Sequence, residues 1–287
     1  MSLLDKVAFN WKYLSQQNHP VRSMLAYVLS KARLSSLIRY RRNGSILQLR
    51  SAGLARILWA DPDFVLDGEL FLSTVFRPGD TVIDVGANIG VLSLLASRLV
   101  GPSGRVLAIE AHPRTYLALL NNLKRNPATN VSPVNIAVGP ELGTVRFSDR
   151  LDDDWNKVEC DSGTLEVEVK PMDDVCAGYG HIDVLKIDVE GFELPVLKGA
   201  TDVLARTDCV LLECWSEHTK GFGYTPNDLI ALMHRASFHG YRLSEAEDEI
   251  SLMPLGRLQR TGALENWVFV RQPAWLSHRC TNPAVLE

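Results

Sequence analysis

Residues 79–110 read GDTVIDVGANIGVLSLLASRLVGPSGRVLAIE. A β-branched run ends in a glycine turn, an apolar pattern with helical spacing follows, and a second turn leads to a second apolar run, which together predict strand, helix and strand. NVSPVNIAVG at 130–139 predicts a third strand, and GTVRFSD with GTLEVEVK a hairpin-like insertion. Strands and helices keep alternating as far as NWVFVRQ at 266–272. This alternation predicts an α/β fold with helices on both faces of a mostly parallel sheet.

The composition is that of an ordinary globular protein, with 287 residues of which 46% are hydrophobic and 22% charged. The five cysteines form no CxxC pair, which argues against a zinc or disulfide framework and favours a reducing cytoplasm. The run VLSLLASRLV is much shorter than a bilayer-spanning helix, and the first residues show no signal-peptide core. We therefore expect a cytoplasmic protein with enough chain for one large core.

Basic residues are concentrated near the N-terminus. Between Val7 and Ala60 there are nine lysines and arginines but no aspartate or glutamate. Apolar residues within 21–38 recur near helical spacing, so we expect residues 1–60 to form a basic, mainly helical extension. The extension either docks as an accessory helix with its basic face in water, or contacts an anionic membrane or a phosphate-bearing substrate. Nucleic acid is a weaker alternative because no aromatic-basic interleaving accompanies the charge.

In such a sheet, ligands bind beyond the carboxyl ends of the strands. The first strand ends in DVGANIG, where Gly86 permits a tight turn, Gly90 lets the helix pack close, and Asp84 and Asn88 can hydrogen-bond a ligand. The glycine spacing is GxxxG, which lacks the central glycine of a dinucleotide site. Glu110 closes the second strand 24 residues after Gly86, where a carboxylate can accept both ribose hydroxyls. The pattern predicts a nucleoside-type cofactor.

These motifs, together with DVLKIDVEGFELPVLKGA at 183–200, resemble the FkbM family of S-adenosylmethionine-dependent methyltransferases. The resemblance runs from about Glu69 to Val270, and its most specific motifs are DVGANIG and KIDVEG. It implies a class I methyltransferase fold, a seven-stranded sheet whose last strand is antiparallel. The methyltransferase domain would span residues 61–271, between the extension and a tail of residues 272–287. The resemblance also implies O-methylation of a small-molecule, glycan or glycolipid hydroxyl.

Site residues can be carried over from the family. The methionine part of the cofactor would be held by Asp84, Gly86, Ala87, Asn88 and Gly90. The ribose would be held by Glu110, and the adenine would lie near Asn135 and Ala137. The usual EPNP is EAHP here, so His112 either contacts the adenosine or caps the next helix.

The stretch LKIDVEGFE at 185–193 is the candidate catalytic segment. Asp188 follows the fourth strand, where a carboxylate can take the proton of an attacking hydroxyl. Lys186 points the same way along the strand, as does Glu190 if the extended path continues. Lys186 holds Asp188 ionised, contacts the cofactor carboxylate, or forms a purely structural ion pair with Asp188. Glu190 either contacts the acceptor or, like Glu193, favours the dipole at the start of the next helix.

Two further residues follow the fifth strand. Glu213 and His218 are candidate acceptor-binding residues, and His218 is a second candidate base. Asp188, Glu190 and Glu213 are also hard oxygen ligands suited to Mg²⁺, but their spacing does not require a metal and we expect none. The alternatives are N- or carboxyl-methylation, or a non-catalytic or NAD-binding module, against which the missing GxGxxG and the intact acid positions argue.

Overall fold

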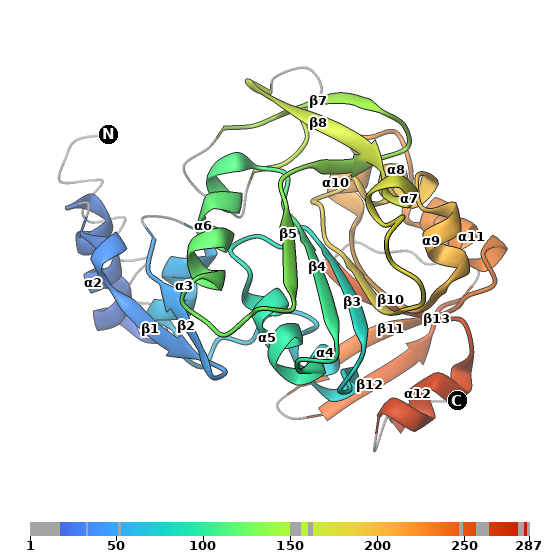
Figure 1. Cartoon of the computed structure of the whole chain (residues 1–287), viewed down its shortest axis with the longest axis horizontal. Helices are drawn as coiled ribbons and strands as arrows, with labels where there is room; N and C mark the ends of the chain where they lie inside the picture. The colour runs from blue at the N-terminus through green and yellow to red at the C-terminus, as the bar shows by residue number, and fades with distance from the viewer. Residues whose placement is uncertain are drawn as a thin grey trace.

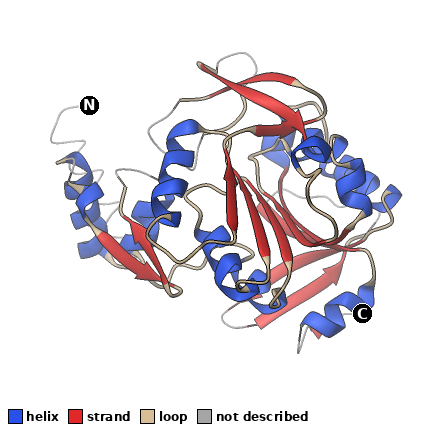
Figure 2. Ribbon diagram, viewed as in Figure 1, coloured by secondary structure: helices blue, strands red, loops and turns tan. Residues whose placement is uncertain are grey.

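The computed structural model describes residues 18–32, 34–50, 53–149, 156–159, 163–246, 249–256, 264–280 and 284–285. Its centre is a twisted sheet with helices on both faces (Figures 1 and 2). The strands of this sheet are β3 (Thr81–Val85), β4 (Arg105–Ile109), β5 (Val131–Val134), β9 (Ile182–Ile187), β10 (Thr207–Trp215), β11 (His239–Ala246), β12 (Glu249–Pro254), β13 (Leu264–Val270) and β14 (Ala284–Val285). Their spatial order is β14-β12-β11-β13-β10-β9-β3-β4-β5.

The strand directions confirm the predicted class I methyltransferase fold. Strands β5, β4, β3, β9 and β10 are parallel, and β13 lies antiparallel between β10 and β11. The sheet has two strands beyond the seven expected. The chain turns back after β11 so that β12 pairs with it in antiparallel fashion, and β14 then pairs with β12.

Alternation along the strands places apolar side chains on both faces of the sheet. Val82, Val106 and Val184 pack with α4 (Glu69–Val75), α5 (Val91–Val100) and α12 (Pro273–Arg279). The neighbouring positions Ile83 and Leu185 pack on the other face with α7 (Met172–Val175), α8 (Glu193–Lys198), α9 (Thr201–Ala205) and α11 (Pro226–Arg235). Burial on both sides explains why these strands read as nearly continuous apolar runs.

A second, three-stranded sheet lies beyond the carboxyl ends of the main strands (Figure 1). It consists of β6 (Ala137–Gly139), β7 (Gly143–Phe147) and β8 (Leu165–Pro171), in the order β6-β8-β7. The antiparallel pairing of β7 with β8 confirms the predicted hairpin. The segment expected as a single third strand is divided, because β5 belongs to the main sheet and β6 to this small one.

The N-terminal segment contains strands as well as helices. Its elements are α2 (Pro20–Lys31), the short 3-10 helix η1 (Ser35–Leu37), β1 (Arg39–Arg42), β2 (Ser45–Gln48) and α3 (Leu54–Ala60). It lies beside α6 (Pro113–Leu123) at the left of Figure 1. The backbone N–H of Ile46 donates to Asn126 Oδ1 at 2.8 Å, and Arg42 forms a buried ion pair with Glu69 at 2.7 Å. These contacts attach the segment to the main sheet's helices.

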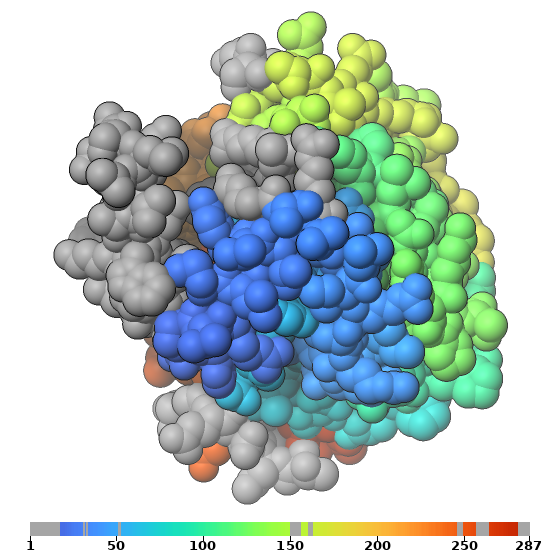
Figure 3. Space-filling view, turned by 90° about the vertical axis from the view of Figure 1, so that its left-hand side faces the viewer, coloured from blue at the N-terminus to red at the C-terminus, as the bar shows by residue number. Residues whose placement is uncertain are grey.

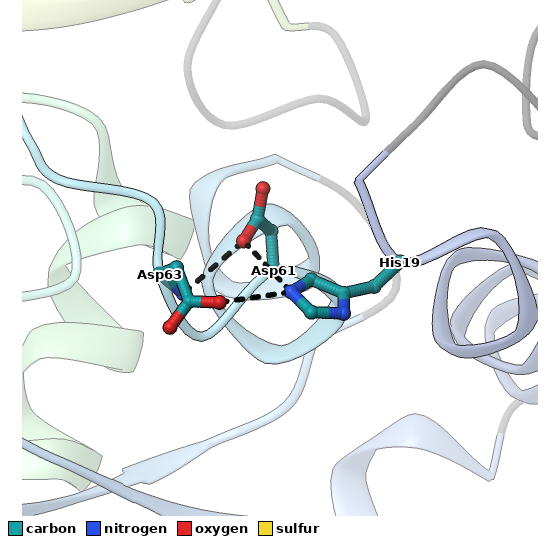
Figure 4. Close-up of side chains that lie close together, drawn as sticks. All are labelled: His19, Asp61 and Asp63. Carbon is teal, nitrogen blue, oxygen red and sulfur yellow. Dashed lines mark hydrogen bonds and ion pairs between the residues drawn. The ribbon is translucent and has the colours of Figure 1, made fainter.

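A second attachment joins the start of α2 to the loop after α3. His19 Nε2 lies 3.1 Å from Asp63 Oδ2 and 3.5 Å from Asp61 Oδ1 (Figure 4). Asn18 Nδ2 donates to the other Asp61 oxygen at 3.0 Å. In the part of the chain that the structure describes, no helix combines the length and apolar character needed to cross a membrane.

Candidate active site

Strand register brings the candidate catalytic residues together. Asp84 on β3 lies beside Lys186 on β9, and Leu211 on β10 lies on the other side of Lys186. Asp188 lies two residues after Lys186, and Glu213 lies two residues after Leu211, so both acids are on the same face of the sheet as Lys186. Residues 84, 186, 188 and 213 therefore meet at the carboxyl end of the sheet because of strand parity and pairing.

Lys186 is the buried cation of this group. Its Nζ lies 3.1 Å from Asp188 Oδ2 and 3.4 Å from Asp84 Oδ1, and it donates to the carbonyl oxygen of Gly86 at 3.1 Å. Burial acts to lower the pKa of Lys186, but Asp188 and Asp84 outweigh it and raise the pKa above its usual value. Lys186 is therefore a permanent positive charge that holds Asp188 in place.

Glu213 behaves differently from Asp188. Burial, followed by the negative charges of Asp188 and Glu190, raises the pKa of Glu213 well above its usual value. Its side chain also hydrogen-bonds Asp188. The raised pKa favours the protonated form of Glu213, which can donate a hydrogen bond toward Asp188, the partner of Lys186.

The chain turns sharply after Asp188. Glu190 adopts a left-handed conformation with φ +56°, and Gly191 follows with φ +101°, so the strand does not continue in extended form to Glu190. The turn carries the Glu190 carboxylate to within 3.1 Å of His218 Nδ1. The ring of His218 packs against Trp215 with centroids 4.2 Å apart, and burial lowers the pKa of His218, which favours the neutral imidazole.

Glu193 holds this turn in place through hydrogen bonds. It is the first residue of α8, and its Oε1 accepts the backbone N–H of Gly191 at 2.9 Å. Tyr224 donates its hydroxyl to the other oxygen of Glu193 at 2.8 Å. The Glu193 side chain is buried in these contacts, so it shapes the turn and does not face the acceptor.

Glu110 is the acid at the end of β4. Its Oε1 accepts the backbone N–H of His112 at 2.9 Å, and its Oε2 accepts the backbone N–H of Asn88 at 2.8 Å. Burial raises the pKa of Glu110 to about 7. Each carboxylate oxygen retains a second lone pair, so the buried acid can still accept hydroxyl donors from a ligand.

Two adjoining cavities, each of about 220 Å³, lie over these residues. The first is lined by Glu110 and by a wall of apolar side chains: Ile109, Ile136, Ala137, Val138, Phe147 and Val158. The second is lined by the motif residues Asp84, Gly86, Ala87 and Asn88 and by Lys186. Asp188 and Glu213 line both, so they stand where the two cavities meet.

Some predicted cofactor residues lie behind the cavity wall. The amide nitrogen of Asn135 donates to the carbonyl oxygens of Glu110 at 2.8 Å and Ala111 at 2.9 Å, so it positions the backbone at Glu110. His112 is buried with Nε2 3.3 Å from Asp149 Oδ1. Neither side chain lines the two cavities. Their direct contact with a cofactor stays a prediction, as does acceptor contact by His218, which is also outside the lining.

Other cavity residues carry no sequence signal. Leu54 and Leu66 line both cavities, and Asp67 and Asn266 line the second. Leu54 begins α3, Leu66 and Asp67 precede α4, and Asn266 lies on β13 opposite Glu213. Asn266 begins the NWVFV stretch, which the sequence predicts only as a strand, and Leu54, Leu66 and Asp67 lie in segments without a recognisable motif, so only the folded chain identifies these residues as part of the site.

Comparison with known proteins places this geometry in a family. Residues 84–243, more than half of the chain, match the Methyltransferase FkbM domain. The chain belongs to the FkbM methyltransferase family. Its match to the hexuronic acid methyltransferase AglP of Haloferax volcanii is 30% identical and covers 55% of this chain and 62% of that one. Methyltransferase sdnD of Sordaria araneosa is 31% identical, over 47% of this chain and 66% of that one.

The alignment with each of these two curated relatives covers less than two thirds of the relative's length. Among solved structures, the precorrin-6y C5,15-methyltransferase of Geobacter metallireducens aligns over 72% of this chain and 90% of that one, with 13% identity and a TM-score of 0.43.

The FkbM family uses S-adenosylmethionine, and the residues present fit that cofactor. A buried carboxylate beside an apolar wall suits an adenosine, since Glu110 could accept ribose hydroxyls while Ala137 and its neighbours would face the base. The second cavity offers Asp84 and the glycine turn for the charged amino-acid end of the cofactor. The glycine turn lacks the central glycine that lets a dinucleotide's pyrophosphate approach the backbone.

Proposed function

We propose that this protein is an S-adenosylmethionine-dependent O-methyltransferase acting on a hydroxyl of a sugar, glycolipid or secondary metabolite. The observation that carries the proposal is the position of Asp188. It lines both cavities, beside the residues that we expect to hold the methionine end of the cofactor, and Lys186 contacts its carboxylate there. A base at the junction of a cofactor cavity and its neighbour can reach the proton of an acceptor hydroxyl.

S-adenosylmethionine supplies a methyl group that is already activated by the sulfonium. What the chain must add is an oriented nucleophile and a proton acceptor. With the cofactor bound, Asp188 would take the proton of the acceptor hydroxyl as the hydroxyl oxygen displaces the sulfur from the methyl carbon in an in-line displacement. An acceptor hydroxyl held at Asp188 would also be within reach of Glu190 and Glu213, since ligand oxygens of these three acids lie within 4.8 Å of one another.

His218 is the second candidate base. Its imidazole is oriented by Glu190 and lies just after β10, and its lowered pKa keeps it able to accept a proton at neutral pH. We favour Asp188 because it lines the cavities and His218 does not.

One feature supports a hydroxyl acceptor. The carboxyl oxygens of Asp188, Glu190 and Glu213 are acceptors for hydroxyl donors, as in a polyol. One curated relative is named for hexuronic acid, a sugar acid with both hydroxyl and carboxyl groups, so it supports a sugar acceptor without choosing between the two groups. Methylation of a carboxyl or nitrogen acceptor is the alternative that the experiment must separate.

The test is transfer of labelled methyl groups from S-adenosylmethionine into an extract of the source cell, followed by base treatment of the purified product. A methyl ester releases its label as volatile methanol, whereas a methyl ether and an N-methyl group both survive base and are told apart by fragment mass analysis of the labelled product. We expect a base-stable product that Asp188→Asn fails to form. A base-labile product would contradict the O-ether assignment, and no labelled product from the folded wild-type chain would contradict methyl transfer itself.

A further inference from the structure

Helix α2 exposes its apolar side to solvent. Val21, Leu25 and Val28 are 81%, 48% and 51% exposed, and their spacing places them on one face. Ser23 and Ala26, on the opposite side, are buried. A helix on the surface of a soluble domain normally shows the reverse arrangement, with its apolar stripe against the core.

The apolar surface continues beyond the helix. Leu34 immediately precedes η1 and is 47% exposed, and Leu37 is the last residue of η1 and is 75% exposed. Of the twelve large apolar side chains that are strongly exposed in the described ranges, five therefore lie within residues 21–37. Single exposed apolar residues need no explanation, but such a concentration marks an interaction surface.

This orientation of α2 is fixed by contacts on its inner side. Arg22 donates to the carbonyl oxygen of Trp59 at 2.7 Å and lies over the indole ring, 5.3 Å from its centroid. His19 contacts Asp63 and Asp61 at the start of the helix (Figure 4). The helix therefore cannot rotate its apolar face inward without breaking these contacts. Viewed from this side, the segment forms the outer surface of the molecule (Figure 3).

The segment that carries this surface is basic in sequence. No aspartate or glutamate occurs between Val7 and Ala60, and Asp61 and Asp63, which follow it, contact His19 at the start of α2. Arg39 and Arg41 alternate along β1 as its exposed residues, so their side chains share one face of that strand. A segment that combines exposed apolar residues with arginines and contains no acid of its own has the composition of segments that lie in the interface of an anionic bilayer.

We propose that the face formed by Val21, Leu25, Val28, Leu34 and Leu37, hereafter the α2 face, docks on an anionic membrane surface. The apolar side chains would enter the interface, and the arginines of the same segment would meet lipid headgroups. A second copy of the chain is a poorer occupant because docking would bring two acid-free basic segments together. Nucleic acid would use the arginines but not the apolar side chains.

The test is sedimentation of the full chain with vesicles of phosphatidylcholine alone and of phosphatidylcholine with phosphatidylglycerol. We expect binding to the anionic vesicles only, weakened by added salt. The double substitution Leu25→Glu and Val28→Glu should reduce binding by about tenfold or more, because it removes apolar area and adds negative charge. Both positions are half exposed, so the fold should tolerate the change, and thermal melting checks this.

The matched control is Leu142→Glu, an exposed leucine in the turn between β6 and β7. It should leave vesicle binding unchanged. Absence of binding to anionic vesicles, or binding that the double substitution leaves intact, would overturn the proposal. A dimer that the double substitution dissociates, without vesicle binding, would assign the α2 face to a second copy instead.

Discussion

Carboxyl groups at this site differ in state because their neighbours differ. Asp188 faces the cation Lys186, whereas Glu213 faces other acids from a half-buried position, where its raised pKa favours the protonated form. Glu193 is committed to backbone N–H groups of the turn. Residue type alone would not separate these three acids, and the separation determines which one can take a proton from an acceptor.

Asp188→Asn tests the assignment of the base. The amide keeps the size of the side chain but cannot accept a hydroxyl proton, so turnover should fall by about 100-fold or more. Affinity for S-adenosylhomocysteine should change only a few fold, because the ribose acid and the glycine turn remain. Turnover is followed as labelled methyl transfer and affinity by calorimetry. Unchanged turnover would transfer the role of base to His218.

Glu110 should make cofactor affinity depend on pH. Burial raises its pKa to about 7, so in the free protein the carboxylate becomes protonated as the pH falls through that value. Ribose hydroxyls donate to the ionised form, and the affinity for S-adenosylhomocysteine should therefore drop about tenfold between pH 8 and pH 6. The stability of the free protein should change with pH in the opposite direction to cofactor affinity. As the pH rises from about 4.5 to about 7, the free energy of unfolding should fall, because Glu110 ionises in a buried position.

The control for this pH dependence is Glu110→Gln. The variant should bind S-adenosylhomocysteine weakly at both pH values, with the slope between them lost. A wild-type affinity that is the same at pH 6 and pH 8 would remove Glu110 as the titrating ribose ligand.

At the scale of elements, the turns after β3 and β9 are in contact. Gly86 has φ +77°, and a Cβ there would lie 1.8 Å from the carbonyl oxygen of Asp188. The first glycine of the GxxxG motif is therefore required by the turn that carries the candidate base, as well as by its own backbone conformation. One contact links the cofactor motif to the catalytic segment.

Gly86→Ala should destabilise the protein by more than about 3 kcal/mol, because the clash adds to the cost of a left-handed alanine. Gly101→Ala is the matched control, since Gly101 has φ +66° but nothing within 4 Å of an added Cβ. It should cost about 1 kcal/mol. Chemical denaturation measures both. Equal losses would show that the close approach of the two turns contributes nothing.

The strands and helices of the main sheet could be predicted because each is long, periodic and bounded by turn residues. Residues 130–139 were harder to predict, because one apolar run supplies β5 and β6 to different sheets. Asn135 lies between these strands, and its side chain hydrogen-bonds the backbone carbonyl of Glu110 just after β4. The acids of the site could be predicted because strand ends in a parallel sheet converge. The apolar walls could not, since Leu54, Leu66 and Phe147 come from three distant segments.

At the scale of the whole molecule, the cavities are completed by residues outside the FkbM match. That match begins at residue 84, whereas Leu54, Leu66 and Asp67 precede it. The matched region thus supplies the acids of the site and the residues proposed to hold the cofactor, and residues 54–67 supply part of the cavity wall. Division of the chain at residues 60 and 271 stays a prediction.

Metal dependence can be tested on the intact protein. Asp188, Glu190 and Glu213 present oxygen ligands of the kind that Mg²⁺ prefers. We expect methyl transfer to survive exhaustive EDTA treatment, because Lys186 already supplies the positive charge beside Asp188. Loss of transfer that Mg²⁺ restores would show that a metal orients the acceptor.

Calorimetric titration of the full chain with S-adenosylhomocysteine, and separately with NAD⁺, tests the cofactor assignment most directly. We predict saturable binding of S-adenosylhomocysteine that Glu110→Gln weakens and Asp188→Asn leaves within a few fold, and no binding of NAD⁺. Binding of NAD⁺ without any binding of S-adenosylhomocysteine or S-adenosylmethionine would contradict the assignment of this site to methyl transfer.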